Sequence, residues 1–238
     1  MIEPVFSALS APHLVAIGLT LTIAFGCAAV TSRGSSGCFD RAVRISLALI
    51  LAINFTGYAL HGTLTGQLDW RQTLPFQLCD WATIGVIIAL LKGGGPRILE
   101  VLYFWGIGGS LQAIITPNLR FGFPDYRFFV FFIDHCGIVI GVVYLLLTRR
   151  FRPAPSSIWR TWLWSIAYFV ITLAVDQLTG VNYGFLLHKP EAFSILSYLS
   201  DERPIYLLQL NLLALAFFAL LYAPFAVYDA LRVARAQV

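Results

Sequence analysis

A cysteine, a carboxylate and an amide stand together at the start of one apolar segment of the chain. The segment opens with Leu74-Pro75-Phe76-Gln77-Leu78-Cys79-Asp80 and continues with mostly apolar side chains to Leu91. Polar side chains inside a membrane are costly and are usually functional or paired. The thiol of Cys79 is a nucleophile once a base removes its proton. We therefore take Cys79 as the candidate nucleophile, with Gln77 and Asp80 beside it.

The base that this thiol needs is available in His135, which follows Asp134 in another apolar segment. We expect Pro75 in the first turn of its helix, because the N–H that proline lacks has no intrahelical partner there. At 1.5 Å per residue, Cys79 then lies about 6 Å and His135 about 12 Å below its helix start. The two side chains are thus expected at similar depths, where they can meet across two helices.

Each candidate also has a plain structural interpretation. A membrane cysteine is often only a small hydrophobic side chain, and Asp134 with His135 can form an ion pair inside a bundle. His61 can orient a substrate, serve as an alternative base or simply cap a helix end. Cys136 points about 100° away from His135 on a helix, which makes it a weaker candidate than Cys79.

Other polar side chains are predicted at the same depth, in the half of the membrane that we expect to be the outer one. Amides and hydroxyls also form hydrogen bonds between membrane helices. Such bonds need neither carboxylates nor imidazoles, so a polar cavity that opens outward explains the group better. The inner half is apolar, with Glu100 and Asp229 near enough to the cytoplasmic surface to extend into it. The outer set comprises Asn54, His61, Gln77, Cys79, Asp80, Gln112, Thr116, Asp134, His135, Asp176, Gln177, Gln209 and Asn211.

The composition indicates that these residues lie in a membrane protein. Of the 238 residues, 58% are hydrophobic and 12% are charged, and the mean hydropathy is +0.78, which is typical of integral membrane proteins. The net charge is +4, but the basic residues are spread over loops, so no nucleic-acid partner is expected. The four cysteines have no C-x-x-C spacing, which indicates neither a zinc site nor a disulfide framework. We expect no metal and no cofactor.

Seven apolar segments are long enough to cross a hydrocarbon core of about 30 Å. We predict an all-α membrane protein, a seven-transmembrane-helix bundle that forms a single domain over residues 1–238. The third segment is the shortest of the seven. The predicted helices lie near residues 12–31, 44–62, 75–91, 98–116, 128–148, 161–178 and 205–227.

The basic residues predict the orientation of this bundle, because cytoplasmic loops are enriched in lysine and arginine. With seven spans, Arg71, Arg120, Arg127, Lys189 and Arg203 fall on one side, and the other eleven of the sixteen basic residues fall on the opposite side. We therefore predict the N-terminus outside and the C-terminus in the cytoplasm. The eleven are Arg33, Arg41, Arg44, Lys92, Arg97, Arg149, Arg150, Arg152, Arg160, Arg232 and Arg235.

An ordered series of motifs runs through the chain from roughly residue 40 to residue 225. It consists of Leu74-Pro75-Phe76-Gln77-Leu78-Cys79, Trp105-Gly106 with Gln112 and Thr116-Pro117, Arg127-Phe128-Phe129 leading to His135, Thr179-Gly180-Val181-Asn182-Tyr183 with Lys189-Pro190, and Pro204-Ile205-Tyr206. The series resembles the bacterial YwaF-like integral membrane proteins and their animal relatives, the transmembrane protein 164 family. Cys136 and Gln77 depart from the pattern, where glycine and histidine are expected.

The resemblance implies a phospholipid acyltransferase with a cysteine nucleophile and a histidine partner, in a fold related to lipid hydrolases that use threonine and histidine. Carried over to this chain, the nucleophile is Cys79 and the base is His135. The expected reaction moves a fatty acyl group from a membrane phospholipid to a lysophospholipid or another acceptor through a thioester. We expect this reaction in a bacterial cytoplasmic membrane, with the active site toward the outer leaflet. Water as the acceptor would make the protein a hydrolase.

Further residues are candidates for supporting roles in that reaction. Gln112, Asn182 and Tyr183 are possible oxyanion donors by their chemistry and depth. Asp134 or Asp176 is a candidate to orient the histidine, although adjacency on one helix disfavours Asp134 for direct contact with His135.

Three other functions are considered for a membrane protein of this kind. A retinal protein is excluded because it needs a lysine in the last helix, and the two lysines are Lys92 and Lys189. A small-solute or proton transporter is the main non-enzymatic alternative, since the intramembrane acids and His135 resemble a relay. The apolar inner half offers such a transporter no polar path. A lipid-binding protein would use the cavity without thiol chemistry.

Overall fold

The long apolar runs form helices, because a helix satisfies its backbone hydrogen bonds internally where water is absent. The computed structural model describes residues 5–32, 37–66, 69–191 and 193–236. The main helices are α1 (Ala11–Ser32), α2 (Gly37–Leu64), α3 (Leu78–Lys92), α4 (Pro96–Leu102), α5 (Leu111–Ile115), α6 (Tyr126–Thr148), α7 (Pro155–Thr179) and α8 (Arg203–Ala236). A π-helical segment, Tyr103–Ser110, joins α4 to α5, so that Pro96–Ile115 is one continuous span.

Six of the resulting spans are long and apolar enough to cross a membrane. The remaining helix, α3, has 15 residues, fewer than the roughly 20 that a simple crossing requires. The protein is therefore an all-α membrane protein with seven principal helical segments among the residues described, counting α4 to α5 as one. The orientation with the N-terminus outside stays a prediction.

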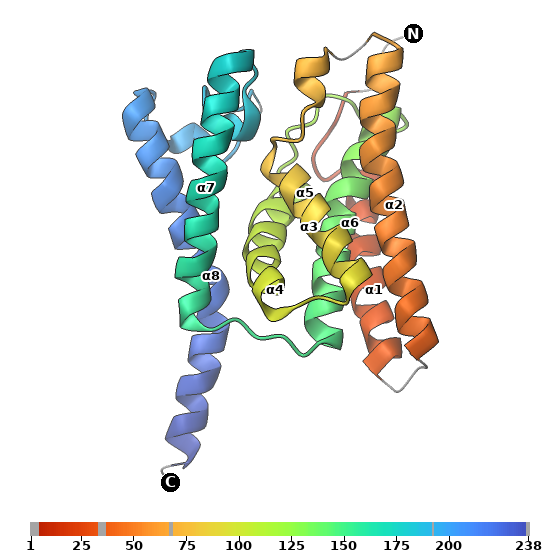
Figure 1. The fold of residues 1–238 in the computed structure, drawn as a ribbon, viewed down its shortest axis with the longest axis vertical. Helices are drawn as coiled ribbons and strands as arrows, with labels where there is room; N and C mark the ends of the chain where they lie inside the picture. The colour runs from red at the N-terminus through yellow and green to blue at the C-terminus, as the bar shows by residue number, and fades with distance from the viewer. Residues whose placement is uncertain (1–4, 33–36, 67–68, 192, 237–238) are drawn as a thin grey trace.

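Successive spans run in opposite directions when α4 to α5 is counted as one (Figure 1). The connections at residues 69–77, 116–125, 180–191 and 193–202 therefore lie at one end of the bundle, which we call the upper end. The turn between α3 and α4, the segment before α7 and the end of α8 lie at the opposite, lower end. This alternation agrees with the predicted order of the segments.

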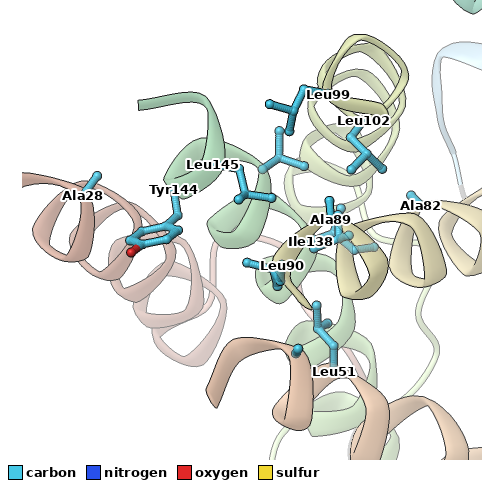
Figure 2. Close-up of a cluster of buried hydrophobic side chains, with 13 residues drawn as sticks. Ala28, Leu51, Ala82, Ala89, Leu90, Leu99, Leu102, Ile138, Tyr144 and Leu145 are labelled. Carbon is cyan, nitrogen blue, oxygen red and sulfur yellow. The ribbon is translucent and has the colours of Figure 1, made fainter. Parts of the chain in front are cut away.

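Helix α6 lies at the centre of the helices α1 to α5, α7 packs beside α4, and α8 packs beside α7 and the π-helical segment (Figure 1). In the most apolar 18 residues of α6, 61% of the residues are buried inside the protein. In the corresponding stretch of α8 the share is 6%. A buried apolar cluster joins α1, α2, α3, α4 and α6 (Figure 2). It includes Leu51 of α2, Leu90 of α3, Leu102 of α4 and Ile138 of α6.

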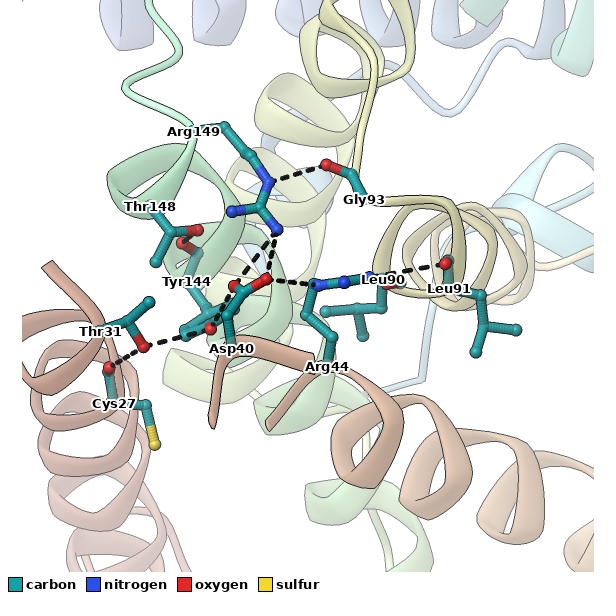
Figure 3. A network of polar contacts seen from close by, with 10 residues as sticks. All are labelled: Cys27, Thr31, Asp40, Arg44, Leu90, Leu91, Gly93, Tyr144, Thr148 and Arg149. Atoms are coloured by element: carbon teal, nitrogen blue, oxygen red, sulfur yellow. Dashed lines mark hydrogen bonds and ion pairs between the residues drawn. The ribbon is translucent and has the colours of Figure 1, made fainter. Parts of the chain in front are cut away.

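An ionic network connects the lower ends of α2, α3 and α6 (Figure 3). Asp40 Oδ2 lies 3.0 Å from Arg44 Nε and 2.9 Å from Arg149 Nη2, and Tyr144 Oη donates to Asp40 Oδ1 at 2.7 Å. The two guanidinium groups also donate to backbone carbonyls of Leu90 and Gly93 at the end of α3. The network therefore supplies partners for a carboxylate in the first turn of α2.

Three expectations about the lower end are corrected by the structure. The second helix begins at Gly37 rather than near residue 44, because the polar first turns are held by the Asp40 network. Glu100 does not extend into solvent: it is 7% exposed and lies 2.6 Å from Arg160 of α7. The seventh helix likewise continues past the predicted residue 227 to Ala236.

Candidate active site

Three side chains with the chemistry of an active site meet at the upper part of α3 and α6. They are Cys79 from the first turn of α3, and Asp134 and His135 from α6. The Cys79 sulfur, one carboxylate oxygen of Asp134 and one ring nitrogen of His135 all lie within 4.8 Å of one another. His135 is buried, with 8% of its surface exposed. The structure thus brings the sulfur and the imidazole into one cluster.

Helix α3 begins three residues later than the sequence predicted, at Leu78 rather than at Pro75. Gln77 has an extended backbone, and its N–H donates to Asp80 Oδ2 at 2.8 Å, which caps the helix. Cys79 therefore sits in the first turn instead of about 6 Å below it. Its sulfur faces the backbone N–H groups of Cys79 and Asp80. These N–H groups favour negative charge on the sulfur, whereas burial and the carboxylates of Asp80 and Asp134 oppose it, so the thiol needs a base to take its proton.

A backbone carbonyl orients the imidazole of His135. Its Nδ1 lies 2.8 Å from the Phe131 carbonyl oxygen, and the two rings stack with centroids 4.2 Å apart. A carbonyl only accepts hydrogen bonds, so Nδ1 carries the proton and Nε2 carries the lone pair. His135 is therefore held in the tautomer whose lone pair is on Nε2.

The carboxylates considered as partners of the histidine are engaged elsewhere. Asp134 Oδ1 accepts a hydrogen bond from the buried hydroxyl of Thr83 at 2.8 Å. Asp176 is fully buried on α7, and its Oδ1 accepts from the N–H of Tyr183 at 3.0 Å. The group that orients His135 is therefore the carbonyl of Phe131. Asp134 and Asp176 were the candidates for this role.

Two glycines of α6 let the neighbouring helices approach directly below this cluster. A Cβ atom at Gly137 would lie 2.7 Å from Leu51 of α2, and a Cβ atom at Gly141 would lie 2.6 Å from Val86 of α3. Real Cβ atoms do not tolerate such distances without a shift of the neighbour. The close approach of α3 to α6 sets the distance between the sulfur and the imidazole.

A groove of about 240 Å³ lies between α2 and α6 at the upper end. His61 is exposed on its edge, with its ring 4.9 Å from that of Tyr126, and Asn54 donates to the Val130 carbonyl at 3.0 Å. Val130 is one helical turn above Asp134. The groove lining consists of Ile53, Asn54, Gly57, Tyr58, His61, Tyr126 and Val130.

The upper connection around residues 180–190 packs on the start of α3. The side-chain oxygen of Gln77 accepts from the N–H of Gly184 at 2.9 Å. Tyr183 is buried and its hydroxyl donates to the Arg71 carbonyl. Burial raises the pKa of Tyr183 to about 12, so its phenol stays protonated at neutral pH. These contacts hold the turn that carries Cys79.

The remaining predicted residues do not join the cluster. Gln112 donates from Nε2 to Thr116 Oγ1 at 2.7 Å within its own helix. The Asn182 side chain accepts from the N–H of Leu187 and donates to the His188 carbonyl, each at 2.8 Å. Both amides, like the Tyr183 hydroxyl, are occupied by intramolecular partners, and their role as oxyanion donors stays a prediction.

Thr83 and the Phe131 carbonyl are parts of the site that the sequence analysis did not identify. Thr83 follows Cys79 by four residues and therefore lies on the same helix face, a spacing that marks it as a candidate. Phe131 precedes His135 by four residues, but its contribution comes from the backbone. Cys136 lies on another face, where it packs against the cluster of Phe128 and Phe132.

A family model described as the TMEM164 family matches residues 8–222. The chain belongs to the TMEM164 family. This finding confirms the resemblance to the transmembrane protein 164 family. The matched range includes all three residues of the cluster. An uncharacterized protein of Treponema pallidum (strain Nichols) is 31% identical over 171 residues, which cover 71% of this chain and 69% of that protein. No solved structure matches the chain.

Proposed function

We propose that this TMEM164-family protein is an integral membrane lipid acyltransferase with Cys79 as nucleophile and His135 as general base. The observation that carries the proposal is the placement of the sulfur within 4.8 Å of a ring nitrogen of His135, in a ring whose Nδ1 faces the Phe131 carbonyl. This distance is longer than a hydrogen bond, but such contacts commonly tighten when substrate binds.

The reaction begins with a phospholipid whose ester carbonyl reaches the sulfur. His135 Nε2 takes the thiol proton, and the sulfur forms a bond to the carbonyl carbon. When the tetrahedral intermediate collapses, the C–O bond breaks and the leaving alkoxide takes the proton from His135. The products are a lysolipid and a thioester on Cys79.

The second half of the reaction reverses these roles. The hydroxyl of a lysophospholipid or another acceptor gives its proton to His135 Nε2 while its oxygen attacks the thioester carbonyl. The C–S bond then breaks, and the sulfur recovers the proton from His135. Water in place of the lipid acceptor yields a free fatty acid, which is the hydrolase variant of the same mechanism.

The negative charge that develops on the carbonyl oxygen needs hydrogen-bond donors. The first-turn N–H groups of α3 lie beside the sulfur, and a helix N-terminus has donors without intrahelical partners. We assign this role to the backbone N–H of Cys79, which lies next to the sulfur. The groove between α2 and α6, with its polar His61 and Tyr58 and its apolar Ile53, suits a lipid that enters from the membrane near the headgroups.

A transporter is the less favoured alternative, because the cluster is separated from the lower-end network by packed apolar side chains. A proton or solute would need a polar path through this layer. The layer contains Leu51, Val86, Leu90, Ile138, Val142 and Leu145, each of which has 0% of its surface exposed.

Intact-protein mass spectrometry after incubation with phospholipid tests the proposal. We expect an added acyl mass on the peptide that contains Cys79, and we expect hydroxylamine to remove it. Cys79→Ala should abolish the adduct and transfer to lysolipid, whereas Cys136→Ser, which removes a thiol outside the cluster, should retain both. An adduct that persists in Cys79→Ala, or none in the wild type across a range of phospholipids, would overturn the proposal.

A further inference from the structure

We infer that Cys79, Asp134 and His135 bind a divalent metal ion of the Zn²⁺ class, and that the bound metal holds the enzyme inactive. The binding half of this inference stands on the geometry alone, while the inhibitory half rests on the proposed function. The sequence analysis predicted no zinc site, because the donors come from two helices rather than from a C-x-x-C motif.

The donor set matches what zinc prefers in proteins. A thiolate sulfur, an imidazole nitrogen and a carboxylate oxygen are its three usual ligand types, and three protein ligands leave the fourth tetrahedral position open. Bonds of about 2.0–2.3 Å place tetrahedral ligands roughly 3.5 Å apart. The three donor atoms already lie within 4.8 Å of one another, so small side-chain rotations are enough to close the site.

Both ligands on α6 have the supporting hydrogen bonds that are common at metal sites. A metal-binding histidine usually donates its other ring N–H to a carbonyl or carboxylate, as Nδ1 of His135 does with the Phe131 carbonyl at 2.8 Å. A metal-binding carboxylate is usually hydrogen-bonded as well, as Asp134 is by the Thr83 hydroxyl at 2.8 Å. These bonds leave His135 Nε2 and an oxygen of Asp134 for the metal.

The charges around the cluster favour a cation. The strongest charged neighbours of the Cys79 sulfur are Asp80 and Asp134, both acidic. Asp80 is held in place by the Gln77 N–H and adds negative potential without joining the three donors. A thiolate and a carboxylate neutralise the two charges of Zn²⁺, and a neutral assembly is the least costly way to bury these groups in a low-dielectric bundle.

Metal binding and acyl transfer compete for the same atoms. Binding of Zn²⁺ displaces water from the ion and releases the Cys79 thiol proton to solvent, and the sulfur lone pair and His135 Nε2 then coordinate the metal. Neither the nucleophile nor the base is available in that state. Removal of the metal by a chelator restores the thiol proton and the lone pair of Nε2.

Titration with Co²⁺ of the full-length protein, purified in detergent and stripped with EDTA, tests the binding. One Co²⁺ per chain is expected, with a sulfur-to-cobalt charge-transfer band in the near ultraviolet. Cys79→Ser should abolish this band, whereas Cys136→Ser should keep it. A band that is absent from the wild type, or that survives Cys79→Ser and disappears in Cys136→Ser, would overturn the inference.

Thr83→Val keeps all three donors and therefore tests the site without removing a ligand. We expect it to weaken Co²⁺ binding about 10- to 100-fold, which is typical for loss of a supporting hydrogen bond. An unchanged affinity in Thr83→Val, together with an unchanged affinity in Asp134→Asn, would show that the carboxylate is not a ligand and would refute the three-residue site.

The two halves of the inference separate in an acyl-adduct assay with and without Zn²⁺. Inhibition of at least tenfold by one equivalent of Zn²⁺, reversed by EDTA, supports the inhibitory role. If Co²⁺ does not bind while the Cys79 adduct still forms, the metal site is refuted and the acyltransferase proposal is supported. If Co²⁺ binds but no adduct forms even after EDTA treatment, the metal site is supported and the acyltransferase proposal is refuted.

Discussion

Replacement of Gly141 by alanine tests whether the close approach of α3 to α6 holds the site together. The new Cβ atom would lie 2.6 Å from Val86 Cγ1, whereas carbon atoms pack best at about 3.5–4.0 Å. The Val86 side chain or the two helices must therefore shift by roughly 1 Å. Overpacking of this kind costs about 1–3 kcal/mol, and the better helix propensity of alanine offsets about 1 kcal/mol of it.

Gly26→Ala in α1 is the matched control, because its Cβ atom would meet nothing within 4 Å. It should gain about 1 kcal/mol from helix propensity without overpacking. The two variants should thus differ by about 1–3 kcal/mol in stability. At about 2–4 °C per kcal/mol for a chain of this size, Gly141→Ala should melt about 2–12 °C below Gly26→Ala. Tryptophan fluorescence during heating in detergent measures both midpoints.

The same displacement should slow the chemistry. A misplacement of about 1 Å at a reacting pair can cost about 100-fold in rate, so Gly141→Ala should form the Cys79 thioester far more slowly than Gly26→Ala. Val86→Ala in the Gly141→Ala background removes the clashing methyl groups and should recover stability, with a favourable coupling of about 1 kcal/mol. Strict additivity of the two substitutions would refute the proposed close contact.

Two further substitutions test charged groups away from the cluster. Asp40→Asn should lower stability by about 2–4 kcal/mol, somewhat less than loss of a fully buried partner, while Asp229→Asn in an exposed pair should cost below about 1 kcal/mol; equal melting midpoints would contradict this ranking. The Arg127 guanidinium, hydrogen-bonded to Asp125, lowers the pKa of that carboxyl, so its ionised form stabilises the fold above the unfolded pKa of about 3.9. The destabilisation by Asp125→Asn should therefore shrink as pH falls from 6 to below 4, and a gap that stays constant with pH would count against the pair.

The residues of the candidate site could be predicted from the sequence because their types are unusual in membrane segments. The thiol of Cys79 and the imidazole of His135 are costly in apolar segments, which indicates a function. The motif series also resembles a known family. Their similar depth followed from the rise of a helix. The start of α3 was placed wrongly at Pro75, because the capping bond from Gln77 to Asp80 was not recognised.

The ionic contacts at the lower end were not predictable in the same way. Asp40 with Arg149, and Glu100 with Arg160, are separated by more than fifty residues along the chain. No periodicity in the sequence links such partners, so Glu100 was expected to extend into solvent. The Asp40 pair also explains why α2 begins before the apolar run that marked it.

The sequence alone determines that this chain forms apolar helices for a membrane and that a thiol, a carboxylate and an imidazole lie within them, because hydropathy and residue type are local properties. The tertiary structure decides which of these groups meet. Contacts between α3 and α6 place Cys79 beside His135, and the Phe131 carbonyl selects the tautomer with its lone pair on Nε2. The reason is physical: helix packing, through glycines such as Gly141, sets distances between residues that are far apart in the chain.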